Sequence, residues 1–220
     1  LAKDCVNLYT RDIILAVRDG SLCELYKTID RDCEVEFLTI ADKDGNRTYA
    51  RGMFFMMIKA IYTVFGKDKV TKVRIEHAIG NGYYGEIEGN VELNADTAKE
   101  VKKEMRRLVS EKVVFHKRSV LTAEASEMFR KHKMYDKEKL FRFRRVSKTN
   151  IYNLGGFEDY FYGYMPASTG ILSVFDLFPY DKGFTAYVDN KEVAVGDLEK
   201  TLKNIIKNDL LANVTVIKNK

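Results

Sequence analysis

The side chains that most often perform catalysis are few and scattered in this sequence. The three histidines lie far apart and lack the spacing of a metal-binding pair: His77, His116 and His132. The three cysteines have no histidine at zinc-site spacing: Cys5, Cys23 and Cys33. An odd number of cysteines without a signal peptide predicts free thiols in a reduced, cytoplasmic protein. We therefore interpret each histidine as an ordinary surface or packed residue and predict no metal site.

Phosphate-binding chemistry of the nucleoside-triphosphatase type is also excluded. The only Gly-Lys pair, Gly66-Lys67, is followed by Asp68 instead of Ser or Thr, and Ile61 stands where the motif requires a glycine. There is no nucleophile-elbow sequence. The sequence therefore predicts no catalytic residues, and neither ATP nor Mg²⁺ is expected to bind this chain.

The most unusual stretch is residues 160–170, which read Y-F-Y-G-Y-M-P-A-S-T-G. Tyr160, Phe161, Tyr162 and Tyr164 surround Gly163, whereas ordinary loops are rich in small polar and charged residues. One interpretation is the wall of a ligand pocket. The other, favoured because aromatic clusters are mostly core, is a packed corner.

Basic residues gather in two places. From Asn94, a helix N-cap, apolar residues recur at helical spacing, and the opposite face carries four cations: Lys102, Lys103, Arg106 and Arg107. The run F-R-F-R-R contributes three more: Arg142, Arg144 and Arg145. Interleaved rings and cations suit RNA by stacking and phosphate contact. For the helix, a solvated basic face is the favoured interpretation, whereas for the F-R-F-R-R run a strand with an exposed arginine face explains the pattern equally well.

Several elements must position these residues. Residues 1–9 read as the end of a short helix. Residues 13–17 and 21–25 predict a hairpin around Asp19-Gly20, and residues 33–40 alternate as a half-buried strand. Residues 41–45 have the composition of a linker, which places a domain boundary near Gly45.

The remaining chain predicts a mixture of helices and strands. Residues 49–65 are apolar around nearly the whole circumference of a helix that ends at Gly66. Strands are expected at 70–79, 83–87, 113–120 and 175–188, with a turn at 80–82. Helices are expected from Asn94, from Thr122 as N-cap, and over 197–206.

Composition sets the outer limits. The chain has 220 residues, 45% of them hydrophobic, which is enough for one large or two modest domains. A formal net charge of +5 permits anionic partners without requiring them. No apolar run approaches the roughly 20 residues that span a bilayer, so we expect no membrane partner.

The order of these segments resembles the amino-terminal half of threonyl-tRNA synthetase. Val17–Gly20 and Asp30–Ile40 are similar to the end of a TGS domain, a ubiquitin-like β-grasp module. Ala41–Phe65 resembles the linker and first helix of the second additional domain of threonyl- and alanyl-tRNA synthetases. Further segments match in the same order: Ile79–Tyr84, Lys102–Val109, Glu124-Ala125 and Pro166–Gly170.

This resemblance implies an α+β fold in three parts. Residues 1–44 would be a partial β-grasp (TGS) module that is incomplete at its N-terminus. Residues 45–190 would be a synthetase editing-domain-like α+β sandwich. Residues 191–220 would be a helix and strand leading to a further domain.

The chain departs from the family at the residues that carry its chemistry. The His-x3-His pair of the editing domain falls on Arg51 and Phe55, and its Cys-x3-His pair falls on Phe161 and Met165. None of the four is a zinc ligand of the family type, so no zinc is expected. The pocket positions that remain are Asp159, Tyr83, Tyr84 and Tyr162. A buried arginine needs a partner, and we expect Arg51 to pair with Asp159.

The same altered segments resemble the amino-terminal region of bacterial uridine kinase-like proteins. They are R-T-Y-A-R at 47–51, I-E-H-A-I-G-N-G-Y-Y at 75–84 and D-Y-F-Y-G-Y-M-P-A-S-T-G at 159–170, and V-G-D-L-E-K at 195–200 resembles the lead-in to the kinase. ATP and Mg²⁺ would then bind only in that kinase domain, outside this chain.

The resemblance therefore implies a non-catalytic, ligand- or RNA-binding regulatory module. Its partners would be a nucleoside, a nucleotide or tRNA, together with the covalently linked kinase domain. One alternative is a metal-independent hydrolase of aminoacyl-tRNA in which Asp159 orients water. Another is a structural scaffold.

Overall fold

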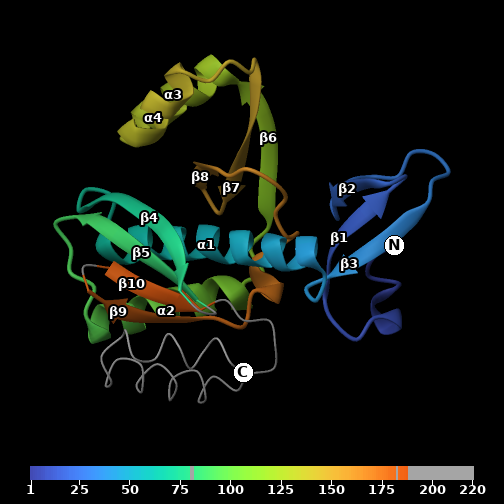
Figure 1. The fold of residues 1–220 in the computed structure, drawn as a ribbon, viewed down its shortest axis with the longest axis horizontal. Helices are drawn as coiled ribbons and strands as arrows, with labels where there is room; N and C mark the ends of the chain where they lie inside the picture. The colour runs from blue at the N-terminus through green and yellow to red at the C-terminus, as the bar shows by residue number, and fades with distance from the viewer. Residues whose placement is uncertain (80–81, 182, 188–220) are drawn as a thin grey trace.

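One long helix, α1 (Lys43–Phe65), runs through the middle of the fold, and three antiparallel sheets are arranged around it (Figure 1). The computed structural model describes residues 1–79, 82–181 and 183–187. The mixture of helices with antiparallel sheets confirms the α+β class. The helix expected over 197–206 and the segment 191–220 lie outside the described residues, as does most of the turn expected at 80–82.

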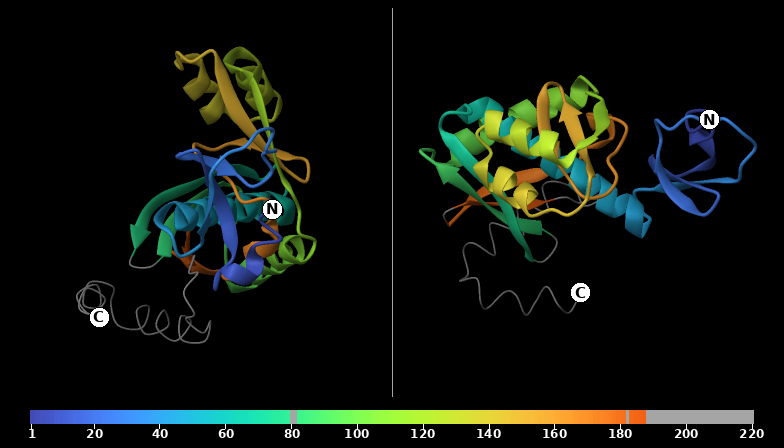
Figure 2. Two further views of the ribbon diagram at one scale, coloured as in Figure 1. Left: turned by 90° about the vertical axis from the view of Figure 1, so that its right-hand side faces the viewer. Right: turned by 90° about the horizontal axis from the view of Figure 1, so that it is seen from above.

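The first sheet lies beside the N-terminal end of α1 (Figure 2). Its strands are β1 (Ile13–Arg18), β2 (Ser21–Glu24) and β3 (Val35–Thr39), in the order β2-β1-β3. Asp19 and Gly20 have φ angles of 49° and 74°, the left-handed conformation of a tight hairpin turn, as predicted. The helical turn before β1 is the short 3₁₀ helix η1 (Val6–Leu8).

The linker expected at residues 41–45 is wrong, because α1 begins at Lys43 and joins the first sheet directly. Asp42 accepts hydrogen bonds from the Thr39 backbone N–H (2.7 Å) and hydroxyl (2.9 Å), which fixes the turn between β3 and the helix. Gly45 lies so close to β3 that an added Cβ would meet the Thr39 carbonyl oxygen at 1.8 Å. Gly45 and Asp42 therefore allow β3 and α1 to join closely, and they do not form a flexible linker.

The second sheet is covered by α1 and α2 (Ala95–Ser110). Its strands are β4 (Val70–Ile79), β5 (Gly82–Gly89), β9 (Asp176–Tyr180) and β10 (Gly183–Tyr187), in the order β4-β5-β10-β9. Asn94 caps α2 as predicted, since its side chain accepts from the backbone N–H groups of Asp96 and Thr97, both at 3.0 Å. The buried face of α2 is the predicted apolar one: Ala98, Val101, Met105 and Leu108.

The third sheet stands on the other side of α1 and extends away from it (Figure 1). Its strands are β6 (Phe115–Leu121), β7 (Lys148–Leu154) and β8 (Phe157–Tyr160), in sequential order. A pair of helices, α3 (Thr122–Lys131) and α4 (Tyr135–Arg142), connects β6 to β7 at the far end. A second 3₁₀ helix, η2 (Thr169–Ile171), follows β8.

Two expectations for this region are wrong. Thr122 is not the N-cap of α3: that position is Leu121, and the Thr122 hydroxyl donates to the Val146 carbonyl instead. The F-R-F-R-R run is not a strand, because it begins in α4 and continues as irregular chain. Phe141 explains the helix, since its ring packs at 5.1 Å from the rings of both Phe129 and Tyr160.

A single buried apolar cluster joins α1 to all three sheets. Twelve residues of α1 are buried, which confirms the predicted core helix. Among the described residues, no helix has both the length and the apolar character needed to cross a membrane.

Candidate functional site

The four positions onto which the resemblance places the metal ligands of the editing motif lie together in the fold. Phe55 on α1 contacts Phe161, with ring centroids 5.0 Å apart. Arg51, one turn earlier on α1, donates to the Tyr164 carbonyl. Met165 is buried, with 1% of its surface exposed. The middle of α1 therefore faces the chain just after β8, and a binding site at this contact would need residues from both segments.

These residues form a packed arrangement. The Phe55 ring is fully buried, and the rings of Phe115 and Phe157 each lie 5.8 Å from it. Gly163, at φ 109°, lies against the guanidinium of Arg51, where an added Cβ would be 2.6 Å from the central guanidinium carbon. Rings and backbone thus occupy the space around the four positions.

A carboxylate that the sequence patterns did not single out enters this region from the first sheet. Glu24, at the end of β2, is only 2% exposed. Its Oε1 accepts from the Tyr152 hydroxyl (2.7 Å) and the Met165 backbone N–H (3.1 Å). Its Oε2 accepts from Lys117 Nζ (2.9 Å) and the Tyr26 hydroxyl (2.8 Å). We call these five residues the Glu24 cluster.

The donors of the Glu24 cluster keep the carboxylate ionised. Burial raises the pKa of Glu24, but the hydrogen bonds from Tyr152, Lys117, Tyr26 and Met165 outweigh burial and leave the pKa below its usual value. Lys117 also lies over the ring of Tyr152, with its Nζ 5.4 Å from the ring centroid. A weak sequence signal existed: Glu24 shares a strand face with the inward-facing Leu22, so alternation points its side chain inward.

Asp159 is the second buried carboxylate of the region, and its partner is not the expected one. It accepts from Lys137 on α4 and from the Tyr160 backbone N–H (2.6 Å). Since Arg51 donates to Tyr164 and Asp159 pairs with Lys137, the predicted Arg51–Asp159 pair is wrong. The sequence patterns predicted no helix at Lys137, so they could not offer this partner.

The Asp159 carboxyl group has fewer hydrogen-bond donors than that of Glu24. Its side chain is 1% exposed, and its Oδ2 has no hydrogen-bond partner among the described residues. Burial raises the pKa of Asp159, and the opposing effect of Lys137 does not cancel it. Asp159 is therefore a carboxyl group biased toward its protonated form.

Curated relatives match most of this chain. A threonine–tRNA ligase of Thermotoga maritima is 29% identical over 177 residues, which are 80% of this chain and 27% of the relative. A threonine–tRNA ligase of Fusobacterium nucleatum is 28% identical over 80% of the chain, and one of Finegoldia magna is 27% identical over 72%. The chain contains a threonyl-tRNA synthetase-like region. It spans about a quarter of the length of these relatives, and no family model matches it.

The synthetase-like region does not present the donors that a zinc ion needs. Arginine and phenylalanine at positions 51, 55 and 161 offer no ligand, and Met165 alone supplies only a thioether. Across residues 1–79, 82–181 and 183–187, no group of three His, Cys, Asp or Glu side chains is arranged to hold a metal ion. The residues at the motif positions therefore do not fit the metal of the editing domain.

The tyrosines expected to line the same pocket lie elsewhere. Tyr83 on β5 packs edge-on against Phe54, with ring centroids 4.8 Å apart, and Phe54 is on a different face of α1 from Phe55. The Tyr84 hydroxyl donates to Glu86 (3.0 Å). Tyr162 is 84% exposed. Of the pocket candidates, these three do not join the packed group around Phe55.

The predicted basic face of α2 is partly used inside the protein. Lys102 pairs with Asp176 (2.9 Å) and its side chain is 18% exposed. Arg107 pairs with Glu104 (2.7 Å) and with Glu111. Lys103 is exposed and lies 4.0 Å from Glu100, and Arg106 has no ion-pair partner in the part of the chain that the structure describes. Only Lys103 and Arg106 are left to contact an anion.

In the second basic group, around the end of α4, some cations are also engaged within the protein and others are exposed. Arg142 pairs with Glu138 (2.6 Å). Arg144 stacks over the Tyr160 ring, with its guanidinium carbon 4.6 Å from the centroid. Arg145 is exposed, without an ion pair among the described residues, and the neighbouring Phe143 is 78% exposed. Because α2 and α4 lie on opposite sides of α1, the two groups do not form one surface (Figure 1).

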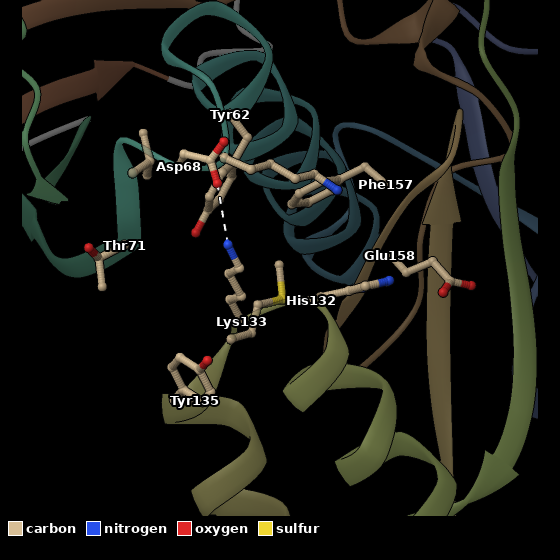
Figure 3. A pocket seen from close by; sticks show the side chains of 11 residues that line it. Tyr62, Asp68, Thr71, His132, Lys133, Tyr135, Phe157 and Glu158 are labelled. Atoms are coloured by element: carbon tan, nitrogen blue, oxygen red, sulfur yellow. Dashed lines mark hydrogen bonds and ion pairs between the residues drawn. The ribbon is translucent and has the colours of Figure 1, made fainter.

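An open cavity of about 180 Å³ lies between the C-terminal end of α1, the start of β4 and the turn between α3 and α4 (Figure 3). The rings of Tyr62 and Phe157 lie 5.4 Å apart in its lining, and Lys133 and Asp68, which also line it, form an ion pair (3.4 Å). Pockets for drug-sized ligands are larger, about 300–1,000 Å³. The size of this cavity suits a small group and not a whole nucleotide.

Proposed function

We propose that this chain is a non-catalytic RNA-binding module related to the editing part of threonyl-tRNA synthetase. The observation that carries the proposal is the contact of Phe55 with Phe161 at 5.0 Å, at two of the four positions where the editing motif has metal ligands. Rings fill the space, and Arg51 is engaged with the Tyr164 carbonyl. A site packed in this way retains the fold without the hydrolytic centre.

The proposed partner is tRNA or a structured part of it. Support comes from the relatives, which are named threonine–tRNA ligase. Three exposed cations are available for phosphate contact: Lys103, Arg106 and Arg145. The exposed ring of Phe143, beside Arg145, offers stacking to an unpaired base.

Binding can be tested by fluorescence anisotropy with labelled tRNA at a series of salt concentrations. We expect Arg106→Ala and Arg145→Ala each to weaken binding. Log K falls with log salt, and each variant should make this negative slope shallower by about 0.7–0.9 if one phosphate contact is lost. Lys99→Ala is the matched control on α2, because Lys99 is exposed but already paired with Asp96 (3.0 Å). Unchanged salt slopes in both arginine variants would assign RNA binding to other residues or to none.

Deacylation of mischarged threonine tRNA, measured with the same protein, separates this proposal from the hydrolase alternative. The specific support for the alternative is the Lys137–Asp159 pair, a carboxyl with a raised pKa beside a cation. The burial of Asp159 opposes it, since no water or ester can reach the carboxyl without a rearrangement. We expect no hydrolysis above the buffer rate. Hydrolysis that Asp159→Asn removes would establish the enzyme instead.

The absence of a metal ligand set leads to a direct measurement. Elemental analysis of the purified protein should find no stoichiometric zinc, because thiolate, imidazole and carboxylate ligands are missing at the motif positions. One zinc per chain would contradict this expectation.

We further propose that residues 1–44 are a TGS-like module and that the whole protein continues into a uridine kinase-like domain that binds ATP and Mg²⁺. The support is the likeness of residues 47–51, 75–84 and 159–170 to such proteins. The test is uridine phosphorylation by the longer protein with and without tRNA. If the longer protein does not phosphorylate uridine, the kinase part of the proposal fails while RNA binding by this chain stands or falls separately.

A further inference from the structure

The four hydrogen bonds to Glu24 come from widely separated parts of the chain. Tyr26 belongs to the same segment as Glu24, but Lys117 is on β6, Tyr152 is on β7 and Met165 follows β8. Three donors thus belong to the third sheet and the segment after it, whereas the carboxylate is supplied by the first sheet. The first sheet contributes an anion to donors that come mainly from elsewhere in the chain.

The donors have the character of a site that requires an anion. Lys117 has a side chain only 16% exposed, and Tyr152 is 1% exposed. An ammonium buried to this extent is costly without an anion, whereas the Tyr152 hydroxyl also lies 2.7 Å from the Gly163 carbonyl oxygen and can donate there if the carboxylate is removed. The Nζ of Lys117 also lies between the rings of Tyr152 and Tyr164, at 5.4 Å and 5.6 Å from their centroids, which orients the cation toward Glu24.

The arrangement of the donors matches a carboxylate. Two donors converge on Oε1, namely the Tyr152 hydroxyl and the Met165 backbone N–H. Two others converge on Oε2, namely Lys117 and the Tyr26 hydroxyl. Two oxygen positions, each with two donors, suit a planar carboxylate better than a tetrahedral phosphate, which would leave further charged oxygens buried without donors.

We propose that Lys117, Tyr152 and the Met165 backbone N–H form a carboxylate-binding site in which Glu24 is the internal ligand. A free monocarboxylate occupies the site when the Glu24 side chain is removed. A carboxylate compound that competes with Glu24 therefore loosens the first sheet from the third sheet. The inference is independent of RNA binding, since none of these residues belongs to the exposed basic groups on α2 and α4.

The test is chemical rescue of Glu24→Ala. This substitution removes the Cγ carbon and the carboxyl group, which together have the size of acetate. We expect sodium acetate to raise the melting temperature of the variant from millimolar concentrations upward, with a further rise that follows the logarithm of the acetate concentration, because a ligand of few atoms binds weakly. Propionate and butyrate should be less effective, because their extra carbons meet the Cβ of the alanine. Sodium chloride at equal ionic strength is the control for salt.

Two further variants make the test specific. Glu24→Gln keeps the site filled with an amide, so acetate should not stabilise it beyond chloride. Glu24→Ala combined with Lys117→Met lacks the cation, and its acetate effect should be lost or strongly reduced. If acetate raises the melting temperature of Glu24→Ala no more than chloride does, or raises that of Glu24→Gln equally, the proposal is overturned.

The test also holds if Glu24→Ala does not fold in chloride. Recovery of a cooperative unfolding transition on addition of acetate, but not chloride, is then the supporting result. Failure of acetate to restore folding in that case overturns the proposal, because a built carboxylate site would regain its anion.

Discussion

At the scale of single residues, two buried carboxylates in neighbouring places have opposite pKa shifts. Glu24 accepts four hydrogen bonds, two on each oxygen, and its pKa is lowered. Asp159 has donors on Oδ1 but none among the described residues on Oδ2, and its pKa is raised. Burial disfavours both charges, so the number of donors decides whether the pKa of the carboxyl group falls or rises.

The lowered pKa of Glu24 predicts a loss of stability in acid. A group with a depressed folded pKa contributes stability above its unfolded pKa and loses it as the pH falls through the folded pKa. At neutral pH, Glu24→Gln should lower the free energy of unfolding by about 3 kcal/mol, since Lys117 loses its buried counter-ion. Urea denaturation between neutral and acidic pH should show this difference shrinking below the usual pKa of glutamate. A difference that stays constant with pH would contradict the assignment.

The raised pKa of Asp159 predicts the opposite dependence. The stability from its protonated form is fully present below the unfolded pKa and is lost as the pH rises through the folded pKa. Asp159→Asn removes this titration. Relative to the natural protein, the variant should therefore gain stability as the pH rises through that window. Parallel stability curves for the two proteins would show that Asp159 does not titrate there.

At the scale of elements, alternation and helical periodicity predicted the helices and strands that depend on the local sequence. They predicted the first hairpin, the buried helix before Gly66, and the Asn94-capped helix with its apolar face, all of which the structure contains. They failed where a contact between residues distant in sequence determines the secondary structure. The F-R-F-R-R run alternates like a strand, yet the packing of Phe141 against Phe129 and Tyr160 makes its start helical.

The contacts of the candidate site also fall into those that the sequence predicted and those that it did not. The family resemblance predicts that the positions of Phe55 and Phe161 lie together, because the family pairs those segments, and the two rings are in contact. It could not supply Glu24 for Lys117, or Lys137 for Asp159, since both pairs join segments whose contact depends on the fold. A glutamate at a strand end and a lysine in a charged run look like ordinary surface residues in the sequence.

The junction between β3 and α1 gives a prediction at this scale. Gly45→Ala should lower the free energy of unfolding by about 2 kcal/mol or more, because the added Cβ would meet the Thr39 carbonyl oxygen at 1.8 Å. Asn46→Ala, on the next and exposed position of α1, is the matched control and should change stability by less than about 0.5 kcal/mol. Chemical denaturation of both variants distinguishes a close junction from a tolerant connection. Equal effects would restore the linker interpretation.

At the scale of the whole molecule, the first sheet is attached to the rest in three ways. One is the direct passage from β3 into α1 at Asp42, a second is the buried apolar cluster that Ile14 and Leu15 of β1 share with α1, and the third is the Glu24 cluster. The Glu24 cluster joins residues up to 141 positions apart. Its loss should therefore loosen the first sheet while the apolar cluster around α1 stays folded.

Amide hydrogen exchange tests this separation. In Glu24→Ala, the amides of β1–β3 should exchange faster by a larger factor than those of β4 and β5, because local opening of the first sheet no longer requires breaking a buried ion pair. Lys117→Met should reproduce the pattern from the other side of the contact. Equal acceleration in both sheets would show that the Glu24 cluster stabilises the whole molecule uniformly.

The long separation between Glu24 and Met165 also has a consequence for synthesis on the ribosome. At about 5–20 residues per second, Glu24 is made roughly 7–30 s before its last donor. Until then, the first sheet depends on its own hairpin and on the start of α1. Nascent chains that end before residue 165 should therefore leave β1–β3 sensitive to protease, and chains released after that point should protect it. The N-terminal part of the protein is made first but becomes fully stable only after residue 165 has been made.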